Sequence, residues 1–263
     1  MEPALAVTLL WLLFGGTHIG LATGPVRAAL VARLDERGFT VLFSAVAAAS
    51  FTLLVAYYAG HRFAGAPGLA LGTVPALRWM LMAVVVIGVA LMAPALVMYP
   101  RTPMALFSQT VQPPRGIERV TRHPFFVGLG LMALAHALLA TRLVGTAFMG
   151  GFAVVSLAGA WHQDRKLLRL RGRPYADYVA ATSLLPFGAI LAGRQQIVWQ
   201  ELPLGVLAAG VAAALALRAV HGAIFDHGGA WLILATVGGA AVATLQSWRH
   251  LRRTRAREAP AVT

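Results

Sequence analysis

The sequence predicts an all-α protein, a polytopic transmembrane helical bundle of about seven spans with an additional interfacial amphipathic helix. Two observations support this fold class. Of the 263 residues, 59% are apolar and only 12% are charged, whereas soluble domains are about 45–50% apolar and about 25% charged. The apolar residues also gather in long runs, and a helix needs about 20 of them to cross about 30 Å of hydrocarbon.

Seven stretches fit a membrane span, and the basic residues between them give one consistent orientation. The stretches are 4–24, 38–59, 77–99, 123–141, 144–161, 202–220 and 229–247. Only a few residues join the fourth stretch to the fifth, which predicts a tight helical hairpin. With seven spans, 18 of the 22 Lys and Arg residues fall on one side. The positive-inside rule then predicts an inner-membrane protein with its N-terminus outside and its C-terminus in the cytoplasm.

The segments outside the spans are basic. Residues 162–185 alternate Leu with Arg or Lys, a pattern typical of an amphipathic helix at the lipid headgroups, here interrupted at 172–174. We expect one transmembrane domain over residues 1–248, followed by a basic, disordered cytoplasmic tail over 249–263 that anionic membrane lipids attract. The N-terminus lacks the basic region and cleavage signal of a secretory peptide, which predicts a retained first helix.

Composition excludes several classes of function. Cysteine is absent, which excludes disulfides, thiol catalysis, Cys-ligated zinc and iron–sulfur clusters. The net charge of +13 sits in the loops between apolar runs. Nucleic-acid binding is therefore not expected, because it would gather the charge on one soluble face.

Two histidines, His18 and His136, lie inside apolar runs. A histidine is costly in hydrocarbon and usually faces protein, a cofactor or a water-filled cavity. His18 is flanked by glycines that would let a flat macrocycle approach the backbone; the alternative is a helix contact at Gly16 and Gly20. His136 lies deep in its run and needs a buried partner. Two histidines from different helices, with no Asp or Glu inside any span, suit bis-histidine haem better than zinc.

His123 differs from these two histidines. Thr121 and Pro124 around it are typical of a helix start, with Thr121 as the cap. The 13-residue step to His136 rotates about 220° along a helix, so the two rings point to separate faces. We expect His123 to lie at the membrane interface, toward a phosphate or a haem propionate. Four arginines on the same predicted side are candidate propionate partners: Arg27, Arg101, Arg122 and Arg194.

The depths of the candidate ligands leave one alternative open. His136 lies about 20 Å from the predicted cytoplasmic start of its helix, whereas His18 lies about 9–14 Å from the cytoplasmic end of its own. Pairing of His18 with His123 therefore stays possible. The remaining histidines are expected in solvated loops or helix ends: His61, His162, His221, His227 and His250. Asp164 and Asp177 are expected to pair with arginines of the 162–185 segment.

A series of motifs follows a fixed order through residues 14–195. They are THIGLA (17–22), RGFTVLFSAV (37–46), YPRT (99–102), RVTRHPFFVG (119–128), LAHALL (134–139), AGAWHQDRKLL (158–168) and TSLLPFGAILAGRQ (182–195). This combination resembles the NnrU family of membrane proteins, and within it the 15-cis-ζ-carotene isomerases. The resemblance implies haem b with His18 and His136 as axial ligands and catalytic residues. It also implies conversion of a central cis double bond to trans in a long apolar polyene that enters from the bilayer, with reduced iron as the active form.

One position departs from that resemblance. Plant isomerases of the family are thought to exchange a cysteine, three residues before the second histidine, for that histidine when the iron is reduced. Here this position is Ala133, so a redox switch in this chain cannot use a thiolate.

Two other functions remain as alternatives. Other NnrU proteins are linked to denitrification, which implies a haem-binding accessory protein of nitric-oxide metabolism without turnover. The chain also resembles membrane methyltransferases of the isoprenylcysteine type, through the RHP motif, Tyr175, Tyr178 and Pro186. Those enzymes use S-adenosylmethionine and usually carry paired glutamates upstream of the tyrosines, where this chain has residues 163–165, Gln-Asp-Arg.

Overall fold

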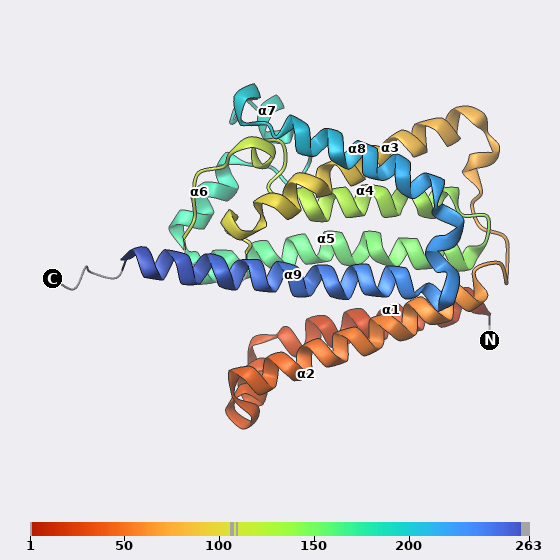
Figure 1. Cartoon of the computed structure of the whole chain (residues 1–263), viewed down its shortest axis with the longest axis horizontal. Helices are drawn as coiled ribbons and strands as arrows, with labels where there is room; N and C mark the ends of the chain where they lie inside the picture. The colour runs from red at the N-terminus through yellow and green to blue at the C-terminus, as the bar shows by residue number, and fades with distance from the viewer. Residues whose placement is uncertain (1, 106–107, 109, 259–263) are drawn as a thin grey trace. The chain divides into compact units, whose positions relative to one another are not determined.

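The computed structural model describes residues 2–105, 108 and 110–258, with side chains described up to Arg253 near the C-terminus (Figure 1). In this part of the chain the regular structure is helical, apart from one isolated β-bridge between Pro67 and Arg142. The predicted all-α class is therefore confirmed.

The described helices include one for each of the seven apolar stretches, together with the short helices α6 and α7. They are α1 (Pro3–Ala22), α2 (Gly24–His61), α3 (Pro75–Met98), α4 (Pro124–Leu139), α5 (Leu143–Arg171), α6 (Arg173–Ala181), α7 (Gly188–Leu191), α8 (Leu204–Ala219) and α9 (Asp226–Glu258). Short 3-10 turns cover Leu71–Thr73, Tyr99–Arg101, Gly116–Arg119, Trp199–Glu201 and His221–Phe225.

Each of the seven predicted stretches coincides with a helix, but the helices differ in length. Five of them, α1, α2, α3, α5 and α9, are long and apolar enough to cross a membrane. The other two, α4 and α8, have 16 residues each, fewer than the ~20 of a typical span. The structure thus supports five spans by length and composition, with α4 and α8 as shorter apolar helices.

Two predicted boundaries differ from the structure. Residues 162–171 do not begin a separate interfacial helix but continue α5, because nothing between Trp161 and Arg171 breaks a helix. The break comes at Gly172, whose φ of +57° is readily adopted only by glycine. At the other end, α9 runs on to Glu258 and so includes residues 249–258 of the predicted tail. Residues 259–263 of the predicted tail lie outside the described residues.

By internal contacts the chain divides into two compact units, and the single transmembrane domain over residues 1–248 stays a prediction. Unit 1 comprises Met1–Leu81, Leu134–Val155 and Val220–Val237; unit 2 comprises Met82–Ala133, Ser156–Ala219 and Gly238–Thr263.

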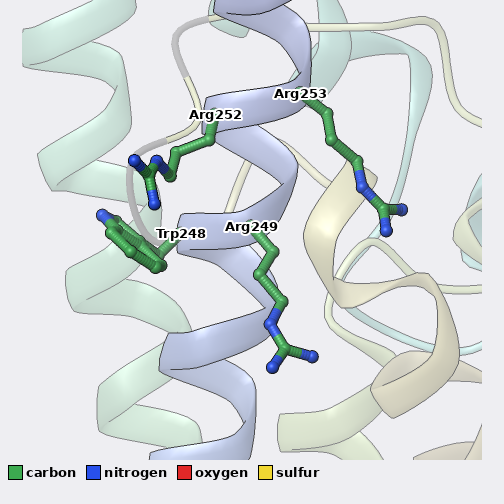
Figure 2. Close-up of a pocket in the computed structure, with 4 residues that line it drawn as sticks. All are labelled: Trp248, Arg249, Arg252 and Arg253. Atoms are coloured by element: carbon green, nitrogen blue, oxygen red, sulfur yellow. The ribbon is translucent and has the colours of Figure 1, made fainter.

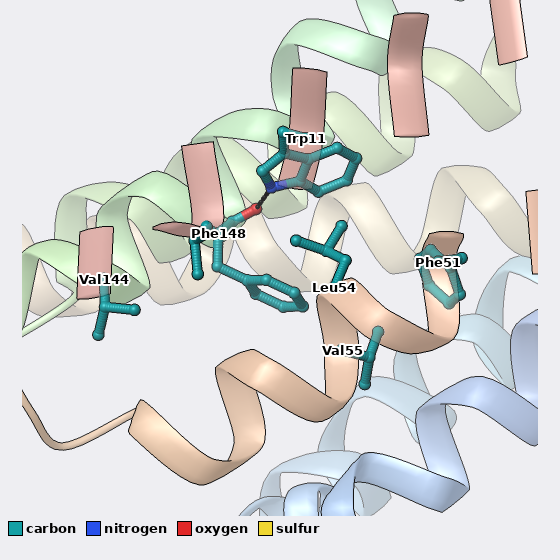
Figure 3. Close-up of a cluster of buried hydrophobic side chains, with 7 residues drawn as sticks. Trp11, Phe51, Leu54, Val55, Val144 and Phe148 are labelled. Carbon is teal, nitrogen blue, oxygen red and sulfur yellow. Dashed lines mark hydrogen bonds between the residues drawn. The ribbon is translucent and has the colours of Figure 1, made fainter. Parts of the chain in front are cut away.

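The core of unit 1 forms around Trp11 of α1 (Figure 3). Its buried members are Val7, Trp11, Phe51, Leu54, Val55, Val144 and Phe148. The Trp11 indole donates a hydrogen bond to the Phe148 carbonyl at 3.0 Å. Gly151 makes room for the indole, since a Cβ at Gly151 would lie 2.2 Å from the ring. This contact fixes α1 against α5 within the unit.

The predicted hairpin between α4 and α5 is confirmed, and its turn belongs to unit 1. Only residues 140–142 separate the two helices. The Gly68 and Ala70 amides donate to the Thr141 and Ala140 carbonyls at 3.0 and 2.9 Å. The loop before α3 thereby satisfies the backbone of this tight turn.

Unit 2 contains a close helix crossing. A Cβ at Gly88 of α3 would lie 2.5 Å from the carbonyl oxygen of Gly128 in α4, and a Cβ at Gly128 would lie 2.5 Å from that of Gly88. Small residues let helix backbones approach in this way. Leu91, Ile117, Val120 and Val127 form the buried cluster beside the crossing.

Candidate functional site

His18 lies in unit 1, in an aromatic surrounding on α1. Its ring stacks on Phe14 with centroids 5.4 Å apart and lies 4.8 Å from the ring of Phe43 in α2. Its Nδ1 atom is buried and has no hydrogen-bond partner within the described residues. A Cβ at Gly16 or Gly20 would meet no atom within 4 Å. The glycines therefore do not serve the tight helix contact that was the alternative explanation for them.

His136, also in unit 1, is half-buried on α4 beside a second histidine. Its ring is nearly parallel to that of His221, with an interplanar angle of 6° and centroids 5.9 Å apart. The neighbouring Ala133 is fully buried. His221 was expected to be a solvated residue; it is exposed, yet it stacks on the predicted ligand. Sequence inspection missed this contact because 85 residues separate the two histidines and no periodicity links them.

Three of the predicted propionate partners engage protein groups, and one of them is Arg122, which pairs with Asp164. Arg27 forms an exposed ion pair with Glu36 at 2.6 Å. Arg194, in unit 2, donates to the carbonyls of Thr182 at 2.8 Å and Ala180. Arg101 is exposed in its 3-10 turn. A role of these arginines toward propionates stays a prediction.

A buried polar network surrounds Asp164 in unit 2. The His123 Nε2–H donates to Asp164 Oδ1 at 2.7 Å, and the Tyr175 hydroxyl donates to the same oxygen at 2.6 Å. Arg122 donates to Oδ2 through Nε at 2.9 Å and Nη2 at 2.7 Å. Burial and the Asp164 carboxylate raise the pKa of Tyr175, so the phenol remains a donor. The carboxylate thus accepts four hydrogen bonds.

The network corrects one expectation about Asp164 and refines another about His123. Of the described partners of Asp164, only Tyr175 lies in the 162–185 segment, and the one arginine among them, Arg122, lies outside it. Asp177 does pair with Arg173, at 2.8 Å, as predicted. The predicted helix start at Pro124 is confirmed, but Thr121 is not the cap, because His123 precedes the helix and the Thr121 hydroxyl donates to the Leu184 carbonyl. His123 itself is 2% exposed, and its role toward a phosphate or propionate stays a prediction.

A second buried pair, Glu118 and Tyr178, was not found from the sequence. Glu118 is 6% exposed and Tyr178 is 3% exposed. Glu118 Oε1 and the Tyr178 hydroxyl lack a well-formed hydrogen bond within the described residues, although each influences the other's ionisation. Burial raises the pKa of Glu118 to about 7. Burial and the charge of Glu118 raise the pKa of Tyr178.

The turn that carries Glu118 is fixed by an ion pair at its edge. Arg119 donates to Glu201 at 2.9 Å, and the Gly116 amide donates to the same carboxylate at 2.9 Å. These bonds lower the pKa of Glu201 to about 2. Thr121 donates to the Leu184 carbonyl at 2.7 Å. The segment before α4 is therefore tied at several points to residues 183–201.

The apolar, membrane-length helices fit a helical membrane protein. The NnrU protein family matches residues 6–227, which is most of the chain. This chain therefore belongs to the NnrU family, as the motifs predicted.

Two curated relatives of the chain are 15-cis-ζ-carotene isomerases. The chain is 32% identical to the chloroplastic 15-cis-ζ-carotene isomerase of Arabidopsis thaliana, over 74% of this chain and 52% of the relative. It is 30% identical to the corresponding protein of Zea mays, over 72% of this chain and 51% of the relative. The chain thus spans about half the length of these curated relatives. No solved structure matches it.

Proposed function

We propose that this protein is a haem b-binding membrane isomerase that converts a cis double bond of a carotenoid, of the 15-cis-ζ-carotene type, to trans. Its membership of the NnrU family and its similarity to two ζ-carotene isomerases support the reaction. The apolar helices support a substrate that arrives through the bilayer.

The surroundings of His18 carry the haem part of the proposal. A buried imidazole nitrogen without a partner costs free energy, and coordination to iron would satisfy it. Open space beside Gly16 and Gly20 suits the approach of a flat macrocycle. His18 and His136, both in unit 1, would hold the group. When bound, haem supplies a redox-active iron, which suits a polyene because that substrate offers no group for acid–base catalysis.

The chain's own residues would orient the ligand and keep the site apolar. Phe14 and Phe43 restrict the rotation of the His18 ring through their contacts at 5.4 and 4.8 Å. Ala133 presents no thiolate beside His136, so histidines alone would serve as protein ligands. Large apolar side chains remain exposed on α1 and α2, where a polyene could lie: Leu12, Leu13, Ile19 and Val41.

An absorption spectrum of the detergent-purified protein, expressed with added haem precursor, tests haem binding. We expect a Soret band, and on dithionite reduction the sharp α and β bands of low-spin bis-histidine haem. A colourless protein would contradict the haem proposal. It would favour the methyltransferase alternative, which S-adenosylmethionine binding would then test.

Histidine variants test the ligand assignment. His18→Ala and His136→Ala should each abolish the low-spin spectrum. His162→Ala is the matched control, because His162 is half-buried on α5 and should leave the spectrum unchanged. His123→Ala should also keep it; loss of the low-spin bands in that variant alone would identify His123 as the partner of His18.

Cells that accumulate tri-cis-ζ-carotene test the reaction. Expression of the chain should produce the trans-central isomer in the dark, and His18→Ala should not. A haem-loaded protein that forms no product would instead support a non-catalytic haem protein of nitric-oxide metabolism.

A further inference from the structure

A cluster of basic residues and one tryptophan lies at the end of the described side chains of α9. Trp248, Arg249, Arg252 and Arg253 line a shallow hollow of about 460 Å³ (Figure 2). Figure 2 shows Trp248 and Arg252 on one side of the helix and Arg249 and Arg253 on another. The Arg252 guanidinium lies 4.5 Å from the centroid of the Trp248 ring, a cation–π contact that holds its position.

The three arginines of this cluster lack acidic partners. Within the described side chains, no carboxylate lies in ion-pair distance of Arg249, Arg252 or Arg253. Five arginines elsewhere do have such a partner: Arg27, Arg62, Arg119, Arg122 and Arg173. Like charges one turn apart on a helix repel each other. An anion that lies between the guanidinium groups would remove this repulsion.

The position of the cluster on α9 identifies the source of that anion. The helix from His221 to Arg253 is a candidate span, and only 6% of its apolar window is buried. Its upstream side chains are apolar and exposed: Trp231, Leu234, Val237, Val242 and Leu245. Such a surface contacts acyl chains. Trp248 and the arginines follow it directly, at the depth where tryptophan and basic residues meet lipid headgroups.

We propose that Trp248, Arg249, Arg252 and Arg253 form a binding site for the phosphate of an anionic phospholipid. Arg249 and Arg253 lie one turn apart and can both donate to one phosphate, with the fork geometry that suits arginine. Arg252 adds a third positive charge from its place on the Trp248 ring. The acyl chains of the lipid lie along the exposed apolar surface of α9. This site is independent of the haem proposal.

Lipid titration of the full-length protein tests the site. The protein in neutral detergent is titrated with phosphatidylglycerol or phosphatidylcholine, and bound lipid is counted by native mass spectrometry. We expect selective retention of phosphatidylglycerol. Arg249→Gln and Arg253→Gln should each weaken it about five-fold, since an arginine near a headgroup contributes about that factor. Equal retention of the two lipids would overturn the proposal.

Arg173→Gln is the matched control, because it removes the same charge from an exposed arginine that already pairs with Asp177. Equal weakening by Arg173→Gln would show that total charge, rather than this site, attracts the lipid. Arg253→Lys keeps the positive charge but loses the two-pronged donor geometry of the guanidinium group. This variant should therefore bind phosphatidylglycerol more weakly than wild type. Inorganic phosphate is titrated separately. If it binds as tightly as phosphatidylglycerol, the site is a phosphate-ion site and the lipid assignment is wrong.

Discussion

At the scale of single residues, the structure gives His18 and His123 different surroundings. His18 lies between two phenylalanines with a buried nitrogen that has no partner. His123 instead follows Arg122 at the start of an apolar run, and its Nε2 is bound to Asp164. The buried Nδ1 of His18 has no partner within the described residues and would gain one from a metal, whereas the Nε2 of His123 is already hydrogen-bonded to a carboxylate. We therefore expect His18 to act as a metal ligand and His123 to act in the Asp164 network.

The Asp164 network predicts a large loss of stability on truncation. Asp164→Ala leaves the buried His123 and the half-buried Arg122 without their carboxylate, and breaking a buried pair in this way costs about 3–5 kcal/mol. Asp177→Ala is the control, because its pair with Arg173 is exposed and surface pairs contribute about 0–1 kcal/mol. Unfolding of both variants in detergent, followed by circular dichroism, measures the difference. Similar midpoints for the two variants would contradict a stabilising role for the network.

Glu118 predicts a pH dependence of stability. Burial raises its pKa from 4.5 to about 7, so the folded protein holds this proton more tightly than the unfolded chain. The free energy of unfolding contributed by Glu118 should therefore be fully present below about pH 4.5 and fall as the pH rises to about 7. The total loss is on the order of 3 kcal/mol.

Unfolding midpoints at pH 5 and pH 8 check this dependence. Glu118→Gln mimics the neutral side chain and should flatten the profile, whereas Glu36→Gln, at an exposed pair with Arg27, should leave the wild-type profile. If Glu118→Gln retains the full decline, another group is responsible.

At the scale of helices, glycines decide where backbones and rings come close. Gly88 and Gly128 allow the crossing of α3 and α4, and Gly151 accommodates the Trp11 ring. Gly150, the residue before Gly151, faces open space instead. Adjacent glycines on α5 thus have different roles, although the sequence shows them only as a pair.

This difference gives a paired prediction. Gly151→Ala places a Cβ 2.2 Å from Trp11, and the indole cannot shift without losing its bond to the Phe148 carbonyl; overpacking of this kind costs about 1–3 kcal/mol. Gly150→Ala should be neutral or stabilise by up to about 1 kcal/mol, because alanine favours the helix. Thermal unfolding in detergent compares the two. A Gly151→Ala variant as stable as Gly150→Ala would show that Trp11 is free to move.

At the scale of the whole molecule, charge predicts the orientation of each loop. Because the chain has no cysteine, single cysteines can be introduced and labelled without background. With seven crossings, Thr141→Cys and Ala223→Cys should react from outside the cell with a membrane-impermeant maleimide, and Gln196→Cys only after permeabilisation. If α8 does not cross, Gln196→Cys and Ala223→Cys should label from the same side.

The sequence by itself determined the fold class, the seven apolar helices, the start of α4 at Pro124 and the family. These features are local or compositional. A long run of apolar residues indicates a membrane helix wherever it lies in the chain. Proline likewise indicates a helix start without any contact to distant residues. It also selected His18 and His136 as candidates, because a histidine in an apolar run is conspicuous before any contact is known.

Only the tertiary structure decided the partners of the polar residues. Asp164 meets His123, 41 residues away, and His221 stacks on His136 from the far end of the chain. The high pKa of Glu118 comes from its burial beside α6. The sequence does not show this burial, because charged residues flank Glu118 and suggest an exposed position. Such contacts depend on how distant segments fold together, and no local pattern encodes them.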